Sequence, residues 1–462
     1  MTTTLLAIGT NKGLFLARST DDRRTWTVDG PQFLMNGIYT VAIDTRRATP
    51  RLLVGADSEH WGPSVFRSDD LGASWQDTPN GAAHFPEGTD ESLRRMWALA
   101  PAPADQPDVV WAGSEPSALW RSEDGGETFS LVRALWDHPH RKEWGAGFGG
   151  QAIHTVLPHP TDSSSVLVAM STGGVYRTAD GGQSWAPANT GIQAVFMPDR
   201  FPEFGQCVHK VARQADRPDQ LFAQNHNGVY RSDDGGATWS SIADGLPSDF
   251  GFAMVAHPRQ PGTAYNFPIV DGGERIPPEA RCRVYRTTDA GQTWEALTEG
   301  LPKSAFYGGV LRDAMCADDS AVAGIYSAPE PARSLPAGTR ATRGPRSRAT
   351  CRTCSAYARP ASRDGEPMTA VLNLPGVLRA HAGGQAHVSV EIADASTTVS
   401  AVLDTLSLEH PALVRRIRDE QGGLRRFVNF YVDDTDVRDL QGLETPVPDG
   451  AQLLVLPSVA GG

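Results

Sequence analysis

An eight-residue motif, repeated six times between residues 19 and 294, constrains the fold of this chain more than any other feature. Its form is S/T-x-D-x-G-x-S/T-W. Its aspartates are Asp21, Asp70, Asp124, Asp180, Asp234 and Asp289. Its closing aromatic residues are Trp26, Trp75, Phe129, Trp185, Trp239 and Trp294, so the motif recurs about every 50 residues. A repeat of this length indicates one supersecondary unit per copy.

The motif is typical of a tight turn between two strands. Aspartate and serine side chains exchange hydrogen bonds with the backbone a few residues away, and glycine tolerates a positive φ. The closing tryptophan is expected to pack beneath the turn. Two copies deviate, because Arg23 replaces the glycine of the first and Phe129 replaces the tryptophan of the third.

Short apolar segments in each repeat predict further strands. Leading strands are expected at 38–43, 96–99, 153–157, 208–211, 252–255 and 307–311, and second strands at positions such as 52–55 and 166–169. With one strand entering the motif and one leaving it, each repeat has four antiparallel strands. We therefore expect residues 1–326 to form an all-β propeller of about seven blades, the last incomplete. The first repeat lacks a leading strand, so a later strand should close the ring.

Residues 327–367 do not continue the pattern. They contain no Val, Ile, Phe, Trp, Met or Lys, and they carry eight arginines against three acidic residues. Such a composition predicts a disordered linker. Codons compatible with residues 327–358, read one base out of frame, permit a peptide that contains S-R-D-E-G-D-P-W and then V-L-R-V-R. We interpret the segment as a frameshifted seventh blade, and a genuine linker is the alternative.

Residues 368–462 predict a separate, small α+β domain. Strands are expected at 368–374, 388–392 and 427–434, and a last apolar segment at 452–462. Between them, Thr397 or Thr398 can cap a helix. The apolar face of that helix is Val399, Val402, Leu403 and Leu406.

The repeats of residues 1–326 resemble the BNR/Asp-box family of β-propellers, which includes sialidases. The motif is a structural device, so the resemblance implies a fold and not a reaction. Sialidases use three arginines, a Tyr–Glu pair and an Arg-Ile-Pro motif before the first blade. This chain has Arg275-Ile276-Pro277 only far downstream, so the resemblance does not imply sialidase catalysis here.

Residues 368–462 resemble the MoaD/ThiS ubiquitin-like sulfur carriers, and most closely the CysO type. The resemblance rests on Leu374-Pro-x-Val-Leu-Arg379, His381-x-Gly-Gly384, Arg426–Asp434 and Leu456–Gly462. It implies a β-grasp fold whose terminal Gly461-Gly462 is the reactive element. An E1-like adenylating and sulfurtransferase enzyme would use ATP to activate Gly462, and the resulting thiocarboxylate would serve a sulfur-accepting synthase. An apolar patch that includes Phe430 and Leu456 is expected to dock these partners.

Polar residues on the loops opposite the motif, together with His209 and Lys210 of a leading strand, form a candidate ligand site near the propeller axis. Carboxylates, imidazoles and cations gathered there can bind a small polar ligand, or a metal through His and Glu. The alternatives are ordinary hydrogen-bonding loop residues and a hydrolytic site. The candidates are Glu59, His60, Glu115, His209, Lys210, His226 and Asp271.

Composition and charge limit the molecules that this protein is expected to bind and the compartment in which it is expected to work. The net charge of −12 argues against nonspecific nucleic-acid binding. No apolar run is long enough to span a membrane. The N-terminus has no signal-peptide pattern, and the five cysteines fit a reducing cytoplasm. We expect no metal site, Cys351-x-x-Cys354 included, and no bound cofactor.

Together these features predict a sulfur carrier for cysteine synthesis, or for molybdopterin or thiamine synthesis, fused to a propeller of unknown ligand. A glycoside-hydrolase-like (exo-sialidase-like) propeller and a propeller interaction scaffold are the alternatives.

Overall fold

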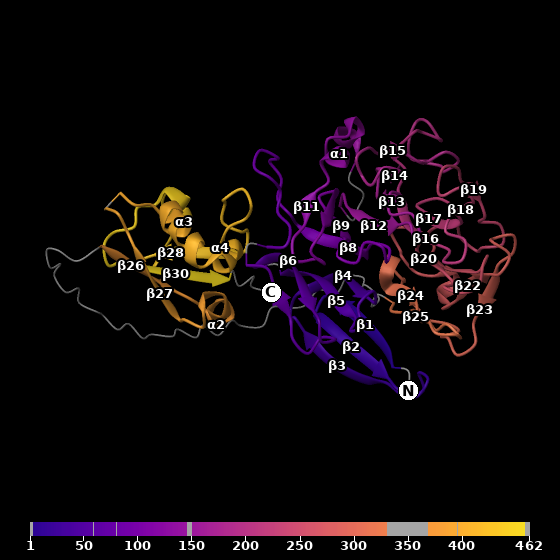
Figure 1. The fold of residues 1–462 in the computed structure, drawn as a ribbon, viewed down its shortest axis with the longest axis horizontal. Helices are drawn as coiled ribbons and strands as arrows, with labels where there is room; N and C mark the ends of the chain where they lie inside the picture. The colour runs from indigo at the N-terminus through magenta and orange to yellow at the C-terminus, as the bar shows by residue number, and fades with distance from the viewer. Residues whose placement is uncertain are drawn as a thin grey trace, which may run out of the picture.

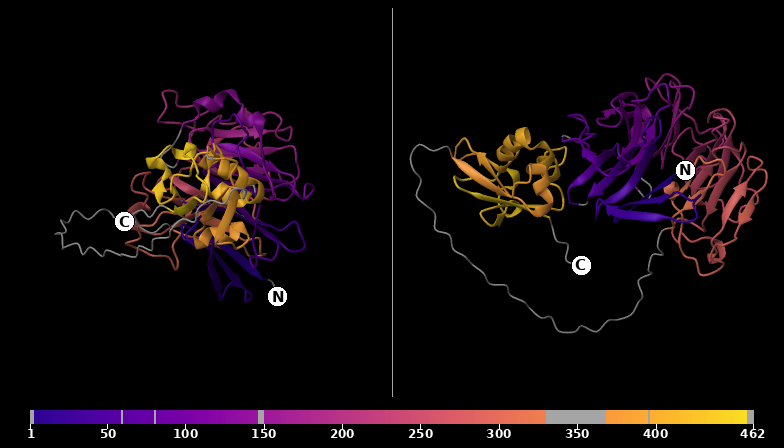
Figure 2. Two further views of the ribbon diagram at one scale, coloured as in Figure 1. Left: turned by 90° about the vertical axis from the view of Figure 1, so that its left-hand side faces the viewer. Right: turned by 60° about the horizontal axis from the view of Figure 1, so that its bottom comes forward.

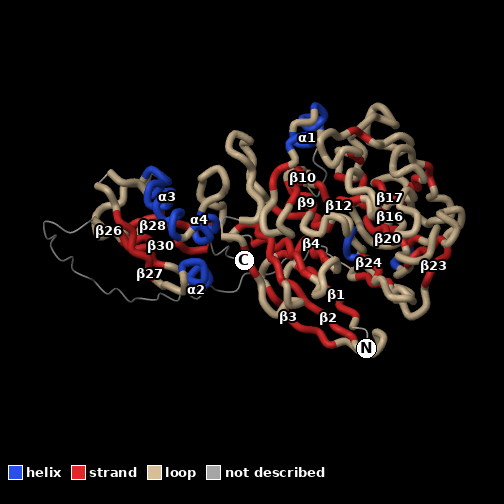
Figure 3. Tube along the Cα trace, in the orientation of Figure 1, coloured by secondary structure: helices blue, strands red, loops and turns tan. Residues whose placement is uncertain are grey.

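The computed structural model describes residues 3–58, 60–79, 81–145, 150–329, 368–394 and 396–457. Figure 1 shows a large unit built from small sheets, followed along the chain by a small unit of sheet and helix. In Figure 3 the large unit is almost wholly strand and loop. No helix among the described residues is long and apolar enough to cross a membrane.

Seven small sheets make up the described part of residues 3–329. Their strands, sheet by sheet, are β1 (Thr4–Thr10), β2 (Gly13–Ser19) and β3 (Thr27–Gln32); β4 (Gly37–Asp44), β5 (Arg51–Ser58), β6 (Gly62–Ser68) and β7 (Gln76–Asp77); β8 (Arg95–Pro101), β9 (Val110–Glu115), β10 (Ala118–Ser122) and β11 (Ser130–Leu131); β12 (Ile153–Pro158), β13 (Val166–Met170), β14 (Gly174–Thr178) and β15 (Ala186–Pro187); β16 (Val208–Arg213), β17 (Leu221–Asn225), β18 (Val229–Ser232) and β19 (Ser240–Ser241); β20 (Gly251–Ala256), β21 (Ala264–Pro268), β22 (Val284–Thr287) and β23 (Glu295–Leu297); and β24 (Met315–Ala317) and β25 (Ile325–Ser327). One short helix, α1 (Arg133–Trp136), and 3-10 turns such as Arg312–Ala314 lie between them.

The strands of each sheet follow one another in chain order, and each is antiparallel to the next. Five of these sheets have four strands, as predicted for a complete repeat. Their leading strands β4, β8, β12, β16 and β20 pack side by side, and β1 and β24 extend this row at its two ends. Such an arrangement is consistent with a β-propeller, in which leading strands line the axis.

The last repeat differs from its prediction. Residues 307–311 form no strand, and the leading strand is β24 instead. Gly308 and Gly309 offer no side chains to a pleated surface, and Val310 is buried in the neighbouring core. The proposed frameshift covers residues 327–367 and includes the predicted closing strand. The structure describes residues 327–329 of this segment, where Ser327 ends β25, and the rest lies outside the described part of the chain.

Side chains join the first sheet to the last. Arg23, which replaces the motif glycine, lies 3.0 Å from Asp318 and donates a 2.7 Å hydrogen bond to the Val322 carbonyl. Trp26 meets Tyr326 edge-on at 5.9 Å. The deviation of the first motif copy is therefore explained, because its arginine bonds across the seam.

The repeated turn is held by its own polar side chains. In the copy at residues 232–239, Asp234 accepts hydrogen bonds from the Ser232 hydroxyl at 2.7 Å, the Thr238 amide at 2.9 Å and the Thr238 hydroxyl at 2.6 Å. Gly236 has φ of 88°, a left-handed conformation that favours glycine. Trp239 donates to the Ala188 carbonyl at 2.9 Å, so the closing tryptophan also ties this sheet to the preceding one.

We expect Asp234→Ala to lower the free energy of unfolding by roughly 1 kcal/mol, as loss of a helix cap does, because backbone and hydroxyl donors lose their acceptor. Burial opposes ionisation, yet the bonds from Thr238 and Ser232 lower the pKa of Asp234 to about 2. A depressed folded-state pKa means that this stabilisation is complete above the unfolded value of about 4 and is lost as pH falls toward 2. Urea denaturation at pH 7 and in this acid range measures both effects.

The matched control is Asp244→Ala, because Asp244 is exposed and its side chain accepts no hydrogen bond from any described residue. Equal losses in the two variants would contradict the role given to the turn.

The small unit is one mixed sheet with helices on one face. Its sheet order is β27-β26-β30-β28-β29, with β26 and β30 parallel. Its elements are β26 (Thr369–Asn373), α2 (Gly376–Arg379), β27 (His387–Glu391), α3 (Val399–Glu409), α4 (Pro411–Ile417), β28 (Val428–Val432), β29 (Thr435–Asp436) and β30 (Gln452–Pro457).

The helix of the small unit agrees with its prediction. The Thr398 hydroxyl accepts the Ala401 amide as the cap of α3. The side chains of α3 buried against the sheet are Val399, Val402, Leu403 and Leu406. The amphipathic pattern of this segment was therefore sufficient to place the helix and its inner face.

The small unit packs against the second sheet of the large one through α4 and the loop after it. Asp77 accepts hydrogen bonds from Arg415 and Arg416, each at 2.8 Å, and all three side chains are largely buried. Beyond them, Glu420 accepts the amides of Phe85 at 2.9 Å and Leu93 at 3.2 Å. The right view of Figure 2 shows the two units side by side, and in the left view the small unit lies in front of the large one.

Candidate functional site

The last described strand of the small unit is fixed in the middle of its sheet. β30 pairs with β26 on one side and β28 on the other, so the chain leaves the domain from a rigid position. Gly461 and Gly462, the predicted reactive residues, lie outside the described residues, which end at Pro457.

The two faces of this sheet differ in burial. Phe430 is fully buried in the core, so its predicted place in a docking patch is wrong. Side chains alternate along a strand, and Asn429 and Tyr431 therefore point away from the helices. Across from them on β30 are Leu456, which is 37% exposed, and Leu454, which is half-buried. The outer face thus presents Tyr431, Leu454 and Leu456 next to the end of β30.

A second candidate site lies in the large unit, where a β-bulge recurs in the leading strands. The leading strands of five sheets each contain one residue more than the partner strand opposite them. A bulge redirects the extra side chain. The extra residues are Tyr39, Trp97, His154, His209 and one of Phe252 and Ala253.

Arg312 connects several of these bulges. Its guanidinium lies over the Trp97 ring at 5.7 Å and the Phe252 ring at 5.4 Å. It also donates to the His209 carbonyl at 3.1 Å and the Ser171 hydroxyl at 3.2 Å. One arginine from the last repeat therefore contacts four other sheets, which places the cluster where their leading strands converge.

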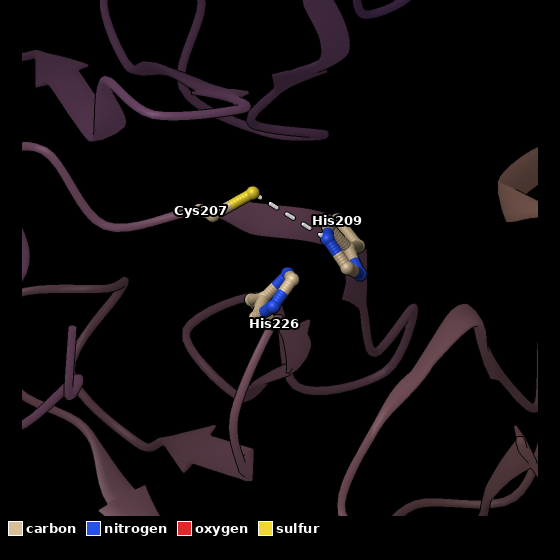
Figure 4. A group of neighbouring side chains, drawn as sticks. All are labelled: Cys207, His209 and His226. Atoms are coloured by element: carbon tan, nitrogen blue, oxygen red, sulfur yellow. Dashed lines mark hydrogen bonds between the residues drawn. The ribbon is translucent and has the colours of Figure 1, made fainter. Parts of the chain in front are cut away.

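Among the described residues, Cys207, His209 and His226 form a group of three possible metal ligands. One ligand atom from each lies within 4.8 Å of the others (Figure 4). Burial, and then the nearby Arg312 charge, hold the pKa of His209 well below its usual range. Burial also lowers the pKa of His226 and raises that of the Cys207 thiol. Burial therefore favours the neutral form of both imidazoles.

The other predicted site residues do not join this group. Glu115 accepts from Trp97 at 3.1 Å, and Lys210 pairs with Asp313. His60 stands near Phe427 of the small unit, and Asp271 is exposed and accepts amides of its own loop. Glu59 lies outside the described residues.

Sequence reasoning missed Cys207, Trp97, His154 and Arg312. The sequence held a signal for three of them. Trp97 and His154 belong to a pattern in which an aromatic or histidine side chain follows the first apolar residue of a leading strand. Cys207 is two residues from His209, a spacing that places both side chains on one face of a strand. Arg312 carried no such signal, because its role comes from neighbours distant in the chain.

Comparison with known proteins separates the two units. The ThiS family model matches residues 372–462. Sulfur carrier protein CysO of Mycobacterium tuberculosis is 40% identical over 97 residues, which are 21% of this chain and 100% of that protein. Through this domain the chain belongs to the ThiS family. The ThiS domain is also 39% identical to a chain of the Amycolatopsis orientalis BexX/CysO complex, covering 20% of this chain and 99% of that one with a TM-score of 0.18.

The large unit is similar to parts of larger glycoside hydrolases. Xyloglucanase of Hypocrea jecorina is 26% identical in an alignment of 308 positions that covers 56% of this chain and 32% of that enzyme. The chain thus spans about a third of that relative's length. An ancestral GH74 enzyme of known structure is 18% identical, covering 61% of this chain and 33% of that one with a TM-score of 0.41. The expected likeness to BNR/Asp-box proteins and sialidases stays a prediction.

Proposed function

We propose that this protein carries sulfur as a thiocarboxylate on Gly462, and that it delivers this sulfur to a biosynthetic enzyme of cysteine synthesis. The observation that carries the proposal is the 40% identity to CysO over the whole length of that carrier. The family match, which continues to residue 462, supports the same assignment.

The chemistry needs an activated carboxylate. The Gly462 carboxylate attacks the α-phosphorus of ATP in the partner enzyme, giving an acyl adenylate and releasing pyrophosphate. A sulfide equivalent then adds to the acyl carbon and expels AMP, which leaves the thiocarboxylate. The side chains of Gly461 and Gly462 are single hydrogens, so an extended tail of this composition can enter a narrow channel.

The described part of the domain supports this role by its rigidity and its outer face. β30 is a central strand, so the tail begins from a fixed point. Tyr431, Leu454 and Leu456 form an apolar surface beside that point. An apolar centre with a polar surround is the usual composition of a docking patch, and we assign the E1-like enzyme and the sulfur-accepting synthase to this face.

The test is mass spectrometry of the full chain after incubation with a CysO-activating enzyme, ATP and a sulfide donor. We expect a mass increase equal to the exchange of one oxygen for one sulfur, located on the C-terminal peptide and dependent on ATP. The positive control is an isolated CysO carrier treated with the same enzyme. An unmodified full chain beside a fully modified control would refute the proposal.

A glycoside-hydrolase activity of the propeller is the second candidate, favoured by its similarity to xyloglucanases. Its test is the release of reducing ends from xyloglucan oligosaccharides by the full chain. Failure to cleave them would contradict this candidate.

A further inference from the structure

Cys207, His209 and His226 lie at one edge of a single sheet. Cys207 and His209 stand at the start of β16, and His226 directly follows β17, which is paired antiparallel to it. The Cys207 thiol is 3.5 Å from Nε2 of His209 (Figure 4). The motif turn at residues 232–239 begins at the end of β18, at the opposite edge, so the group is separate from the repeated turn.

Backbone contacts hold these three side chains in place. Nδ1 of His209 donates to the Gly251 carbonyl at 2.6 Å, which leaves Nε2 as the free ligand atom facing the thiol. Metal-binding histidines in proteins are commonly oriented by this kind of bond. The His226 amide donates to the Cys207 carbonyl at 2.8 Å, so the third residue is tied to the first.

Aromatic rings complete the surroundings. His209 stacks on Phe252 at 4.5 Å, and His226 meets Phe250 edge-on at 4.9 Å. Cys207 and His209 are buried, whereas His226 is half-buried. Two buried ligands beside one that is partly exposed are compatible with a bound ion that keeps an exchangeable ligand.

We propose that Cys207, His209 and His226 bind a Zn²⁺ ion, with the fourth position open to water. One thiolate and two neutral imidazoles are a ligand set that suits zinc, and three protein ligands are typical of sites that keep an open position. On binding, the Cys207 thiol releases its proton to solvent and its sulfur coordinates the metal. Zinc–ligand bonds of about 2.0–2.3 Å require the ligand atoms to draw together by roughly 1 Å. His226, on its loop, makes this movement.

Charged side chains of both signs surround the group. Arg312 places a positive charge near Cys207 and His209. Arg275 adds positive charge on the His209 side, and Asp249 adds negative charge on the His226 side. The alternative is a cluster held only by the thiol–imidazole contact, without a metal.

The experiment uses the full chain, freed of metal by a chelator and titrated with Co²⁺ as a spectroscopic substitute for Zn²⁺. We expect one Co²⁺ per chain, a near-ultraviolet thiolate-to-cobalt band, and loss of this band when Zn²⁺ is added. Cys207→Ser should abolish the band. His226→Ala should weaken Co²⁺ binding at least about tenfold, because one of three ligands is removed.

The other four cysteines supply the controls. Cys282→Ser, Cys316→Ser and the double change at Cys351 and Cys354 should leave the band intact. Near-ultraviolet circular dichroism reports whether each variant is folded, and the half-buried His226 gives a ligand variant with little effect on the core. A wild-type chain without the band would overturn the proposal. So would a band that survives Cys207→Ser or that disappears only with Cys351 and Cys354.

Discussion

We expect deletion of Gly462 to abolish thiocarboxylate formation and to leave the melting temperature of the protein unchanged. The new terminal carboxylate, on Gly461, is short of the reactive position by one residue, or about 3.5 Å. A displacement of about 1 Å can already lower a rate about 100-fold, so we expect no detectable product. The measurements are intact mass after incubation with the activating enzyme and ATP, and thermal unfolding of the same sample.

Two variants sharpen this prediction. Gly462→Ala keeps the length of the tail and adds one methyl group. It therefore distinguishes an effect of tail length from an effect of side-chain size. Leu408→Ala removes an 84% exposed side chain from α3, on the helical side of the sheet, and should be modified like wild type. Full modification of the shortened chain would show that Gly462 is not the acceptor.

We expect Asp77→Ala to release the ThiS domain from the propeller. The change leaves Arg415 and Arg416 as buried guanidinium groups without their shared carboxylate. Removing one partner of a buried ion pair costs about 3–5 kcal/mol, because the remaining charge stays desolvated. The amides of Phe85 and Leu93, which donate to Glu420 across the same interface, should then exchange with solvent about 100-fold faster.

Hydrogen exchange followed by mass spectrometry measures this release in the intact chain. Asp29→Ala is the matched control, because Asp29 pairs with Arg18 on the exposed surface of the first sheet and such pairs contribute little. Exchange in β28, inside the core of the ThiS domain, should stay slow in both variants. Unchanged protection of the Phe85 and Leu93 amides in Asp77→Ala would contradict the interface.

The sequence alone determined the features whose causes lie within a few residues of one another. The repeated turn was predictable because Ser232, Asp234 and Thr238 bond within one eight-residue motif. Helix α3 was predictable because its cap and its apolar face follow the period of a helix. The burial of Phe430 was predicted wrongly, although the alternation along β28 would have placed it on the inner face.

Only the tertiary structure decided the contacts between residues far apart in the chain. Local patterns do not indicate that Arg312 donates a hydrogen bond to Ser171, or that Asp77 pairs with Arg415. Each contact depends on how whole sheets and domains pack. The same holds for the zinc group we propose. The spacing of Cys207 and His209 was visible in the sequence, but His226 joins them only because β16 and β17 pair in one register and bring two strand ends to the same edge.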